Sequence, residues 1–225
     1  MLASLKGKNV FLTGATGGIG RELAYQFARS GCNLFLTGRD IDNRYGTTGF
    51  QAGDLENTQD VLSLVEGANN CLGKIDILVN CAGSFIVKPL FESSLDDFDM
   101  SFNVNVRAPF LFSREFAKSM SKSGWGRIIN IGSSSSYSGF SNTSLYCSSK
   151  HGMSRSFYDE LKDHNIKTFC FSPGSVKTEM GKKVKNQDFS TFIDPEELAE
   201  YIVFTISFDS DMISEELRIN RFKIQ

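Results

Sequence analysis

A short apolar strand that runs directly into a glycine-rich turn limits the possible folds of this chain more than any other feature. The segment 9–13 reads Asn-Val-Phe-Leu-Thr, and segment 14–20 continues as Gly-Ala-Thr-Gly-Gly-Ile-Gly. Gly14 allows a tight turn, Gly18 lets backbone N–H groups approach a phosphate, and Gly20 lets a following helix pack close to the strand. The pattern favours a dinucleotide pyrophosphate at a helix N-terminus. Its spacing is one residue longer than the usual fingerprint, so a purely structural turn is the alternative.

The rest of the chain alternates apolar strands with amphipathic helices. The pattern predicts strands at Val10–Thr13, Leu34–Thr37, Ile75–Asn80, Arg127–Ile131, Lys167–Ser172 and Leu217–Asn220. It predicts helices at Ile19–Ser30, Thr58–Cys71, Asp96–Met120, Leu145–His164 and Pro195–Phe208. Such alternation is typical of an α/β fold with one doubly wound parallel sheet, of about seven strands, and helices on both faces. No linker or repeat divides the chain, so we expect one domain over residues 1–225.

Composition excludes several functional classes. The chain has 225 residues, 40% hydrophobic and 22% charged, with a net charge of -2, which suits one globular domain. This charge gives no bulk attraction to nucleic acid or to an anionic membrane, and no apolar run approaches the length of a membrane span. The five cysteines form no Cys-x-x-Cys pair. We therefore expect a soluble cytoplasmic protein with no metal site, no nucleic-acid partner and no membrane partner.

Three residues in the middle of the chain have the spacing of a proton-transfer group. Ser133 precedes Tyr146 by thirteen residues, and Lys150 follows one helical turn later. Tyr146 and Lys150 would share a helix face, where the ammonium favours the phenolate. A free phenol, with a pKa of about 10, needs a shift of roughly three units, or about 4 kcal/mol, to act near neutral pH. Tyr-x-x-x-Lys alone is weak evidence, because solvated helix faces often contain it.

Six motifs in order resemble the motif set of the short-chain dehydrogenase/reductase family. They are Thr13-Gly-Ala-Thr-Gly-Gly-Ile-Gly20, Asn80-Cys-Ala-Gly83, Asn105, Ser133, Tyr146-Cys-Ser-Ser-Lys150 and Pro173-Gly174. The match extends from about residue 9 to residue 178, which is most of the chain. The resemblance implies hydride transfer between a nicotinamide and a carbonyl or secondary alcohol carbon.

The resemblance also assigns four catalytic residues. Tyr146 donates the proton during reduction, and Ser133 hydrogen-bonds the substrate oxygen. Lys150 favours the phenolate and binds the nicotinamide ribose. Asn105 completes a proton relay, with Asn103 as a competing candidate two residues earlier.

The cofactor residues that the resemblance implies are spread over the whole chain. They are Gly14, Thr16, Gly17, Gly18, Ile19, Gly20, Arg39, Asp54, Leu55, Asn80, Ala82, Gly83, Tyr146, Lys150, Pro173, Gly174, Val176 and Thr178. Arg39 favours NADP because it would pair with the extra phosphate, whereas the neighbouring Asp40 would suit NAD. Two departures from the family pattern are Gly17, where a second basic residue often stands, and Cys81, which replaces an asparagine.

The adenine side departs further from the usual layout. Asp54 and Leu55 resemble the segment that borders the adenine. Only fourteen residues separate Arg39 from Asp54, too few for a full crossover helix and a strand. We therefore expect one helix to be reduced to a loop here.

The substrate is the least determined part of the prediction. A polar loop at about residues 175–193 carries Lys177, Lys182, Lys183 and Lys185 against Glu179 and Asp188. An anionic substrate is one hypothesis, and a merely solubilising flap is the other. A 3-oxoacyl-[acyl-carrier-protein] reductase and a reductase of phosphorylated or nucleotide-linked sugars are specific alternatives. A non-catalytic dinucleotide-binding regulator is the alternative from another class. The resemblance implies a homodimer or homotetramer through the helices predicted at Asp96–Met120 and Leu145–His164.

Overall fold

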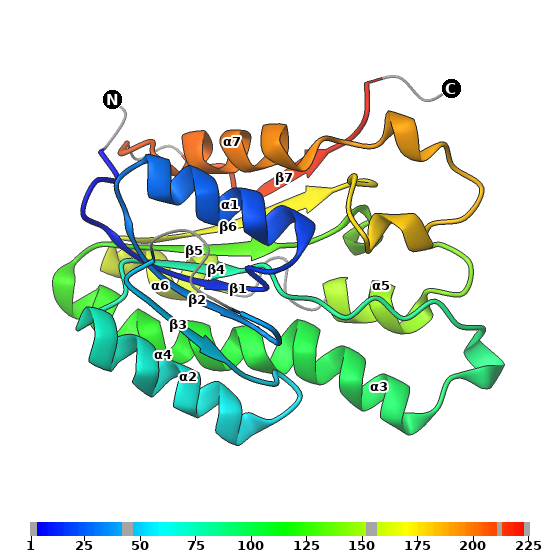
Figure 1. Cartoon of the computed structure of the whole chain (residues 1–225), viewed down its shortest axis with the longest axis horizontal. Coiled ribbons are helices and arrows are strands. Elements are labelled where there is room, and N and C mark those ends of the chain that lie inside the picture. Colours follow the sequence, from blue (N-terminus) through cyan, green and yellow to red (C-terminus); the bar gives the residue numbers. More distant parts are fainter. Residues whose placement is uncertain (1–3, 42–46, 152–156, 211–212, 223–225) are drawn as a thin grey trace.

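Seven parallel strands form one sheet in the computed structural model of the chain, in the order β3-β2-β1-β4-β5-β6-β7 (Figure 1). The structure describes residues 4–41, 47–151, 157–210 and 213–222. The strands are β1 (Asn9–Thr13), β2 (Asn33–Gly38), β3 (Gly49–Ala52), β4 (Ile77–Asn80), β5 (Gly126–Ile131), β6 (Ile166–Pro173) and β7 (Glu216–Ile219). The strand order reverses between β1 and β4, and open α/β sheets bind ligands in the crevice beside such a point. The predicted fold class is confirmed.

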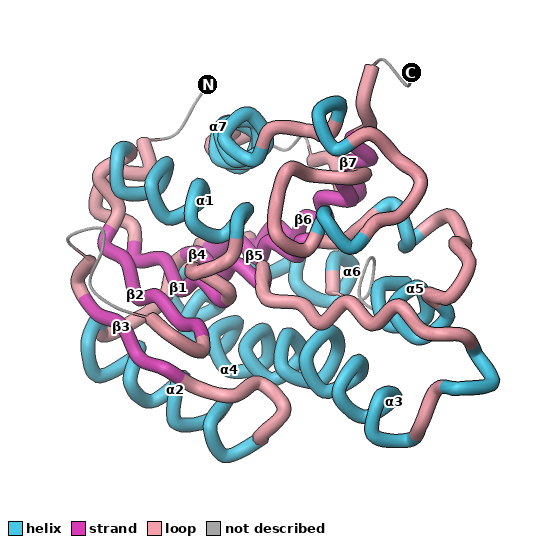
Figure 2. The backbone as a smooth tube through the Cα atoms, turned by 45° about the vertical axis from the view of Figure 1, so that its right-hand side comes forward, coloured by secondary structure: helices cyan, strands magenta, loops and turns pink. Residues whose placement is uncertain are grey.

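Helices cover both faces of the sheet (Figures 1 and 2). One face carries α1 (Gly18–Arg29) and α7 (Pro195–Ile206), and the opposite face carries α2 (Thr58–Leu72) and α4 (Ala108–Ser123). The remaining helices are α3 (Leu95–Phe102), α5 (Ser144–His151) and α6 (Tyr158–Leu161). The described helices are all too short or too polar to cross a membrane.

Alternating side chains of the strands build two separate cores. In β1, Val10 and Leu12 belong to the cluster under α1 and α7. Phe11 points the other way, and its ring centroid lies 4.9 Å from those of Phe112 and Phe116 on α4. Because both faces of the strand are buried, β1 reads as a continuous apolar run, as central parallel strands do.

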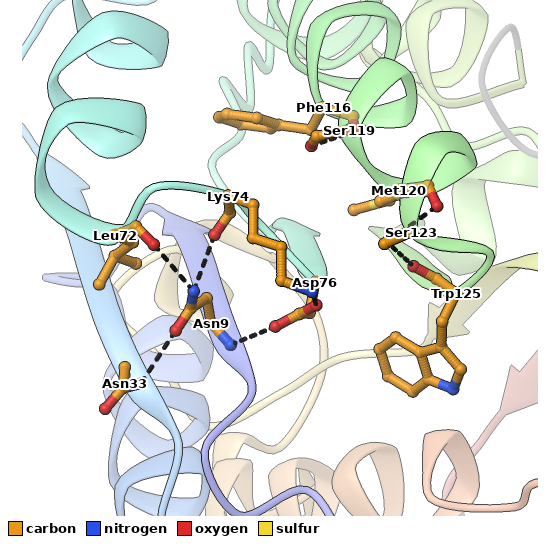
Figure 3. Close-up of polar contacts among 10 residues, drawn as sticks. All are labelled: Asn9, Asn33, Leu72, Lys74, Asp76, Phe116, Ser119, Met120, Ser123 and Trp125. Carbon is orange, nitrogen blue, oxygen red and sulfur yellow. Dashed lines mark hydrogen bonds and ion pairs between the residues drawn. The ribbon is translucent and has the colours of Figure 1, made fainter.

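Polar side chains fix the amino-terminal edge of the sheet (Figure 3). The Asn9 side chain donates to the carbonyl oxygens of Leu72 and Lys74 at 3.0 and 2.9 Å. Its backbone N–H donates to the Asp76 carboxylate at 2.9 Å, and its side-chain oxygen accepts from Asn33 at 2.9 Å. One residue thus joins β1, β2 and the segment that leads into β4. The opposite, carboxyl-terminal edge of the strands carries the candidate site.

Three predicted elements differ from the structure. β3 was not among the strands predicted by range, and the described residues between β2 and β3 contain no helix, as the short spacing predicted. The predicted helix Asp96–Met120 consists of α3, a π-helical segment at Asn103–Arg107, and α4. The predicted helix Leu145–His164 begins as α5; residues 152–156 lie outside the described part, and the chain ends this region with α6 and a 3₁₀ turn.

Candidate active site

The glycine turn after β1 is a close fit to the backbone around it. Gly14 has φ +70°, and a Cβ built on it would lie 2.8 Å from the backbone of Ala82. A Cβ on Gly20 would overlap with the carbonyl oxygen of Gly14. Both positions therefore require glycine, the first for its conformation and for space and the second for space. The turn also places two predicted cofactor segments, at Gly14 and at Ala82, in contact.

The N-terminus of α1 is built to accept an anion. Its N-cap residue, Gly17, has no side chain to accept hydrogen bonds from the first-turn amides. By contrast, the N-cap of α2, Asn57, accepts from two backbone N–H groups of its own helix. Free first-turn amides and the helix dipole together favour a phosphate group. This arrangement fits the pyrophosphate of a dinucleotide, with Gly18 and Ile19 in the first turn.

Tyr146 and Lys150 lie together in a buried part of α5. Their exposed fractions are 7% and 9%, and the Lys150 Nζ lies 5.8 Å from the centroid of the Tyr146 ring. The same Nζ donates to the carbonyl oxygen of Ile131 at 2.8 Å, at the end of β5. The ring of Phe85 packs edge-on against Tyr146 at 4.6 Å between centroids. The predicted pair is thus held at the carboxyl-terminal edge of the sheet.

Asn105 lies in the π-helical segment and reaches the same place. Its Nδ2 donates to the Ser84 carbonyl oxygen and to Ser149 Oγ, and its Oδ1 accepts from the Ser84 N–H, all at 2.9 Å. A Cβ on Gly83 would lie 3.3 Å from Asn105 Oδ1 and 3.5 Å from Lys150 Nζ. Gly83, Asn105 and Lys150 therefore converge. Single π-helical turns within α-helices are common at functional sites.

A small cavity of about 20 Å³ lies beside Lys150. Its lining includes Asn80, Asn105, Asn130 and Lys150. Asn80 Nδ2 donates to Asn130 Oδ1 at 2.9 Å, while the buried Asn80 Oδ1 has no protein partner. The cavity is large enough for one water, and Asn80 Oδ1 offers that water a hydrogen-bond acceptor.

Ser133 follows β5 and caps the turn after it. Its hydroxyl accepts from the N–H of Ser135 at 3.1 Å, at the start of a 3₁₀ turn (Ser134–Ser136). Among the described residues, no hydrogen bond joins it to Tyr146. The turn is nevertheless tied to α5, because Ser136 Oγ donates to the Lys150 carbonyl oxygen at 3.3 Å.

The adenine side is arranged by its own loop. Arg39 and Asp40 are both exposed just beyond β2, and Thr16 Oγ1 lies 3.0 Å from a Cβ built on Gly38. Asp54 Oδ1 accepts from the N–H of Glu56 at 3.0 Å, and Leu55 packs against the core.

The nicotinamide side begins at the end of β6. The Gly174 N–H, after Pro173, donates to the Ile219 carbonyl oxygen at 2.8 Å. Val176 is buried and pairs with Ile193 across the base of the loop 175–193. A Cβ on Gly18 would overlap with the methyl group of Thr178, so this loop reaches the glycine turn.

Burial raises the pKa of the Cys81 thiol to about 12, against the opposing effect of Lys150, so the thiol stays protonated at neutral pH. Within the described segments, no three His, Cys, Asp or Glu residues gather as metal ligands would.

Sequence reasoning missed several residues that connect the predicted ones. Ser149 Oγ accepts from Asn105 and donates to the Tyr146 carbonyl oxygen at 2.9 Å. Arg107 donates to the carbonyl oxygen of Glu56 and so joins the π-helical segment to the adenine-side loop. Ser149 could have been found from its place within Tyr-x-x-x-Lys. The partner of Arg107 lies 51 positions away and left no signal in the sequence.

Comparisons with known proteins identify the family. A family model described as short chain dehydrogenase matches residues 8–188. The 3-oxoacyl-[acyl-carrier-protein] reductase FabG of Aquifex aeolicus is 30% identical, with 96% of this chain and 97% of the relative covered. The L-xylulose reductase of Mesocricetus auratus is 31% identical, with 92% of each covered.

A solved structure gives the same result. The crystal structure of a blue fluorescent protein from a metagenomic library in complex with NADPH has a TM-score of 0.85 and 28% identity. It covers 96% of this chain and 97% of that chain. The chain belongs to the short-chain dehydrogenase/reductase family, NAD(P)-dependent oxidoreductases that act on carbonyl and alcohol groups.

Proposed function

We propose that this protein reduces a carbonyl compound, or oxidises the matching alcohol, with Tyr146 as the acid–base group. A bound nicotinamide dinucleotide supplies the hydride chemistry. Tyr146 gives its proton to the substrate oxygen, and Ser133 donates a hydrogen bond to the same oxygen. Lys150 favours the phenolate, and Asn105 stands at the cavity through which a proton can be resupplied. The observation that carries the proposal is that Tyr146, Lys150 and Asn105 are buried close together, at the same edge of the sheet as the glycine turn.

A Tyr146→Phe variant tests the acid–base assignment. Removal of a general acid costs about 10²- to 10⁴-fold in rate, so kcat with a panel of carbonyl compounds should fall by that factor. The Kd for NADPH, measured by fluorescence titration, should change less than threefold. Wild-type protein that binds NADPH and oxidises it with none of the carbonyl compounds would favour the non-catalytic regulator. A variant that keeps its full kcat would refute the role of Tyr146.

NADP is the cofactor that we favour. Arg39 is exposed at the end of β2, where a guanidinium can pair with the additional phosphate, and a structural relative is a complex with NADPH. An Arg39→Gln variant should raise the KM for NADPH about tenfold and leave the KM for NADH unchanged. Asp40 is the competing feature, and a wild-type preference for NADH would refute the assignment.

An anionic substrate remains our hypothesis for the loop 175–193, which we propose as the substrate loop of a single domain, residues 1–225. Lys183 and Lys185 are exposed, whereas Lys182 forms an ion pair with Glu179 at 2.5 Å, which reduces the net charge offered to a ligand. Carrier-bound 3-oxoacyl groups and sugars are the substrate classes named in the relatives. We would compare kcat/KM for neutral and phosphorylated ketones of the same carbon skeleton at several salt concentrations. Equal values throughout would leave only the solubilising role.

We also propose that the chain forms a homodimer or a homotetramer. Large apolar side chains are exposed on α3 and α4, among them Leu95, Phe98 and Phe110 at 81%, 42% and 44%. Light scattering coupled to size-exclusion chromatography should give twice or four times the mass of one chain. Phe98→Glu should shift the measured mass toward that of one chain, and an unchanged mass would remove this face from the interface.

We place the protein in the cytoplasm, since its five cysteines are all free thiols.

A further inference from the structure

The end of β7 and the residues just after it contact two segments at the carboxyl-terminal edge of the sheet, the loop 175–193 and the segment after Ser133. Ile219 accepts from Gly174, just before the loop 175–193. Asn220 Oδ1 accepts from the hydroxyl of Tyr137, in the segment after Ser133, at 3.3 Å. Arg221 extends into the loop 175–193 itself. The end of β7 and residues 220 and 221 therefore lie beside the segment after Ser133 and the loop 175–193.

Arg221 makes two side-chain hydrogen bonds to that loop. Its Nη1 donates to Thr191 Oγ1 and its Nη2 donates to Gln187 Oε1, both at 2.7 Å. Its guanidinium carbon lies 5.2 Å from the centroid of the Phe192 ring, which is 3% exposed. The planar guanidinium is suited to two such acceptors and to an aromatic face at the same time.

Each of the two acceptor side chains makes a further hydrogen bond within the loop. Gln187 Oε1 also accepts from Ser175 Oγ at 3.1 Å. Thr191 Oγ1 donates to the carbonyl oxygen of Asp188 at 2.7 Å. One arginine thus connects the start of the loop, through Gln187, to the 3₁₀ turn near its end, through Thr191.

Apart from Arg221, the loop is held by the buried side chains of Val176 and Phe192, by the packing of Thr178 on Gly18 and by backbone bonds at its base. Its base is closed by two backbone hydrogen bonds, from Lys177 to Ile193 and from Ile193 to Ser175, both at 2.9 Å. Between them, the backbone hydrogen bonds span two to four residues, and residues 185–190 are exposed. Segments with this pattern open at low free energy. The guanidinium of Arg221, which lies outside the loop, is therefore well placed to control how often the loop opens.

The position of this loop affects the candidate site directly. Thr178 packs on Gly18 of the glycine turn, so the first part of the loop lies beside the α1 N-terminus. We propose that Arg221 is a positioning residue: it holds the loop 175–193 closed over the glycine turn by binding Gln187 and Thr191. This inference goes beyond the proposed function and does not depend on the identity of the substrate.

Hydrogen exchange with mass spectrometry on the cofactor-free protein tests the proposal. Arg221→Met keeps the apolar stem and removes the donors. Amides bonded inside the loop, such as those of Lys182 and Val184, should exchange at least tenfold faster, equivalent to about 1.4 kcal/mol. Arg221→Lys keeps the charge but loses the fork, and should give an intermediate increase.

Arg29→Met is the matched control, because Arg29 also lies over an aromatic ring, Tyr25, at 5.6 Å on α1. It should leave exchange in residues 175–193 unchanged. A Thr191→Val variant removes one acceptor, and its effect combined with Arg221→Met should be smaller than the sum of the two.

Unchanged exchange in the loop of Arg221→Met would overturn the proposal, and so would faster exchange spread evenly over the sheet, because that would report a general loss of stability. An inactive enzyme whose loop still opens on Arg221→Met would count against the proposed function alone. The two ideas can therefore fail separately.

Discussion

Asn105 and Ser149 should differ sharply in what their side chains contribute to stability. Asn105→Leu removes three hydrogen bonds at 2.9 Å, worth about 1 kcal/mol each. It also leaves the N–H and the carbonyl oxygen of Ser84 without their partner, in a part-buried position. An unsatisfied polar group adds about 1–3 kcal/mol when fully buried, and because these two groups are only part-buried we count at most about 1 kcal/mol for each. The total expected loss in the free energy of unfolding is about 3–5 kcal/mol.

Ser149→Ala should cost less, although the hydroxyl is fully buried. Its partners keep other acceptors: Asn105 Nδ2 still donates to Ser84, and Ser101 Oγ still donates to the Leu145 carbonyl oxygen at 3.4 Å. We expect a loss of about 1–2 kcal/mol. Urea unfolding followed by the fluorescence of Trp125, the single tryptophan, measures both variants.

Ser148→Ala is the control for this comparison, because Ser148 is exposed on the same helix and should change stability by less than about 0.5 kcal/mol. A loss for Ser149→Ala equal to that of Asn105→Leu would contradict the reasoning, since it would show that the retained partners do not compensate. So would losses below about 0.5 kcal/mol for both. Losses that small would mean that the hydrogen-bond network around the π-helical segment is not what holds Asn105.

Three further predictions concern single groups. Gly14→Ala should abolish NADPH binding in a fluorescence titration, because a Cβ would meet the Ala82 backbone at 2.8 Å and φ is +70°; retained binding would contradict this. At pH 8, iodoacetamide should modify exposed Cys71 well before Cys81, whose pKa burial raises to about 12, and equal labelling in peptide maps would disprove it. A hydrogen bond from Lys88, together with backbone and side-chain hydrogen bonds from Ser94, lowers the pKa of Asp97 to about 2. Its stabilising effect is therefore complete above about pH 5 and is lost as the pH falls toward 2, so the difference in Tm between wild type and Asp97→Asn should shrink over that range in scanning calorimetry; a constant difference would exclude the linkage.

The sequence revealed those parts of the fold whose signals are local. The turn at Gly14 and the helix after it are specified within a dozen residues, because steric limits on a glycine act on its immediate neighbours. The start of α7 was equally readable, since Asp194 caps it and Pro195 is its first residue. The strand β3, by contrast, is only four residues long and exposes Phe50 while Gln51 is half-buried, so its hydrophobicity pattern does not indicate a strand.

The π-helical segment shows a different limit of sequence reasoning. The periodicity of residues 96–120 fits one helix, and one extra residue in a single turn changes that periodicity very little. What holds the segment is the bonding of Asn105 to Ser84, which follows β4. That contact depends on β4 and the helix being neighbours in space, so a one-dimensional pattern cannot contain it.

The two edges of the sheet use polar side chains in different ways, and this difference explains which variants should affect stability and which should affect the site. At the amino-terminal edge, Asn9 bonds to backbone groups of adjoining segments and leaves little freedom there (Figure 3). At the carboxyl-terminal edge, Lys150 and Asn105 are also fixed, by Ile131 and Ser84, before any ligand binds. Preorganisation of this kind favours catalysis because no group has to be ordered during the reaction. The loop held by Arg221 is less fixed, since its residues 185–190 are exposed and Arg221 joins it to the residues after β7 through two side-chain hydrogen bonds. Substitutions at Lys150 or Asn105 should therefore disturb chemistry and stability together, whereas substitutions at Arg221 should change access to a site whose rigid half stays intact.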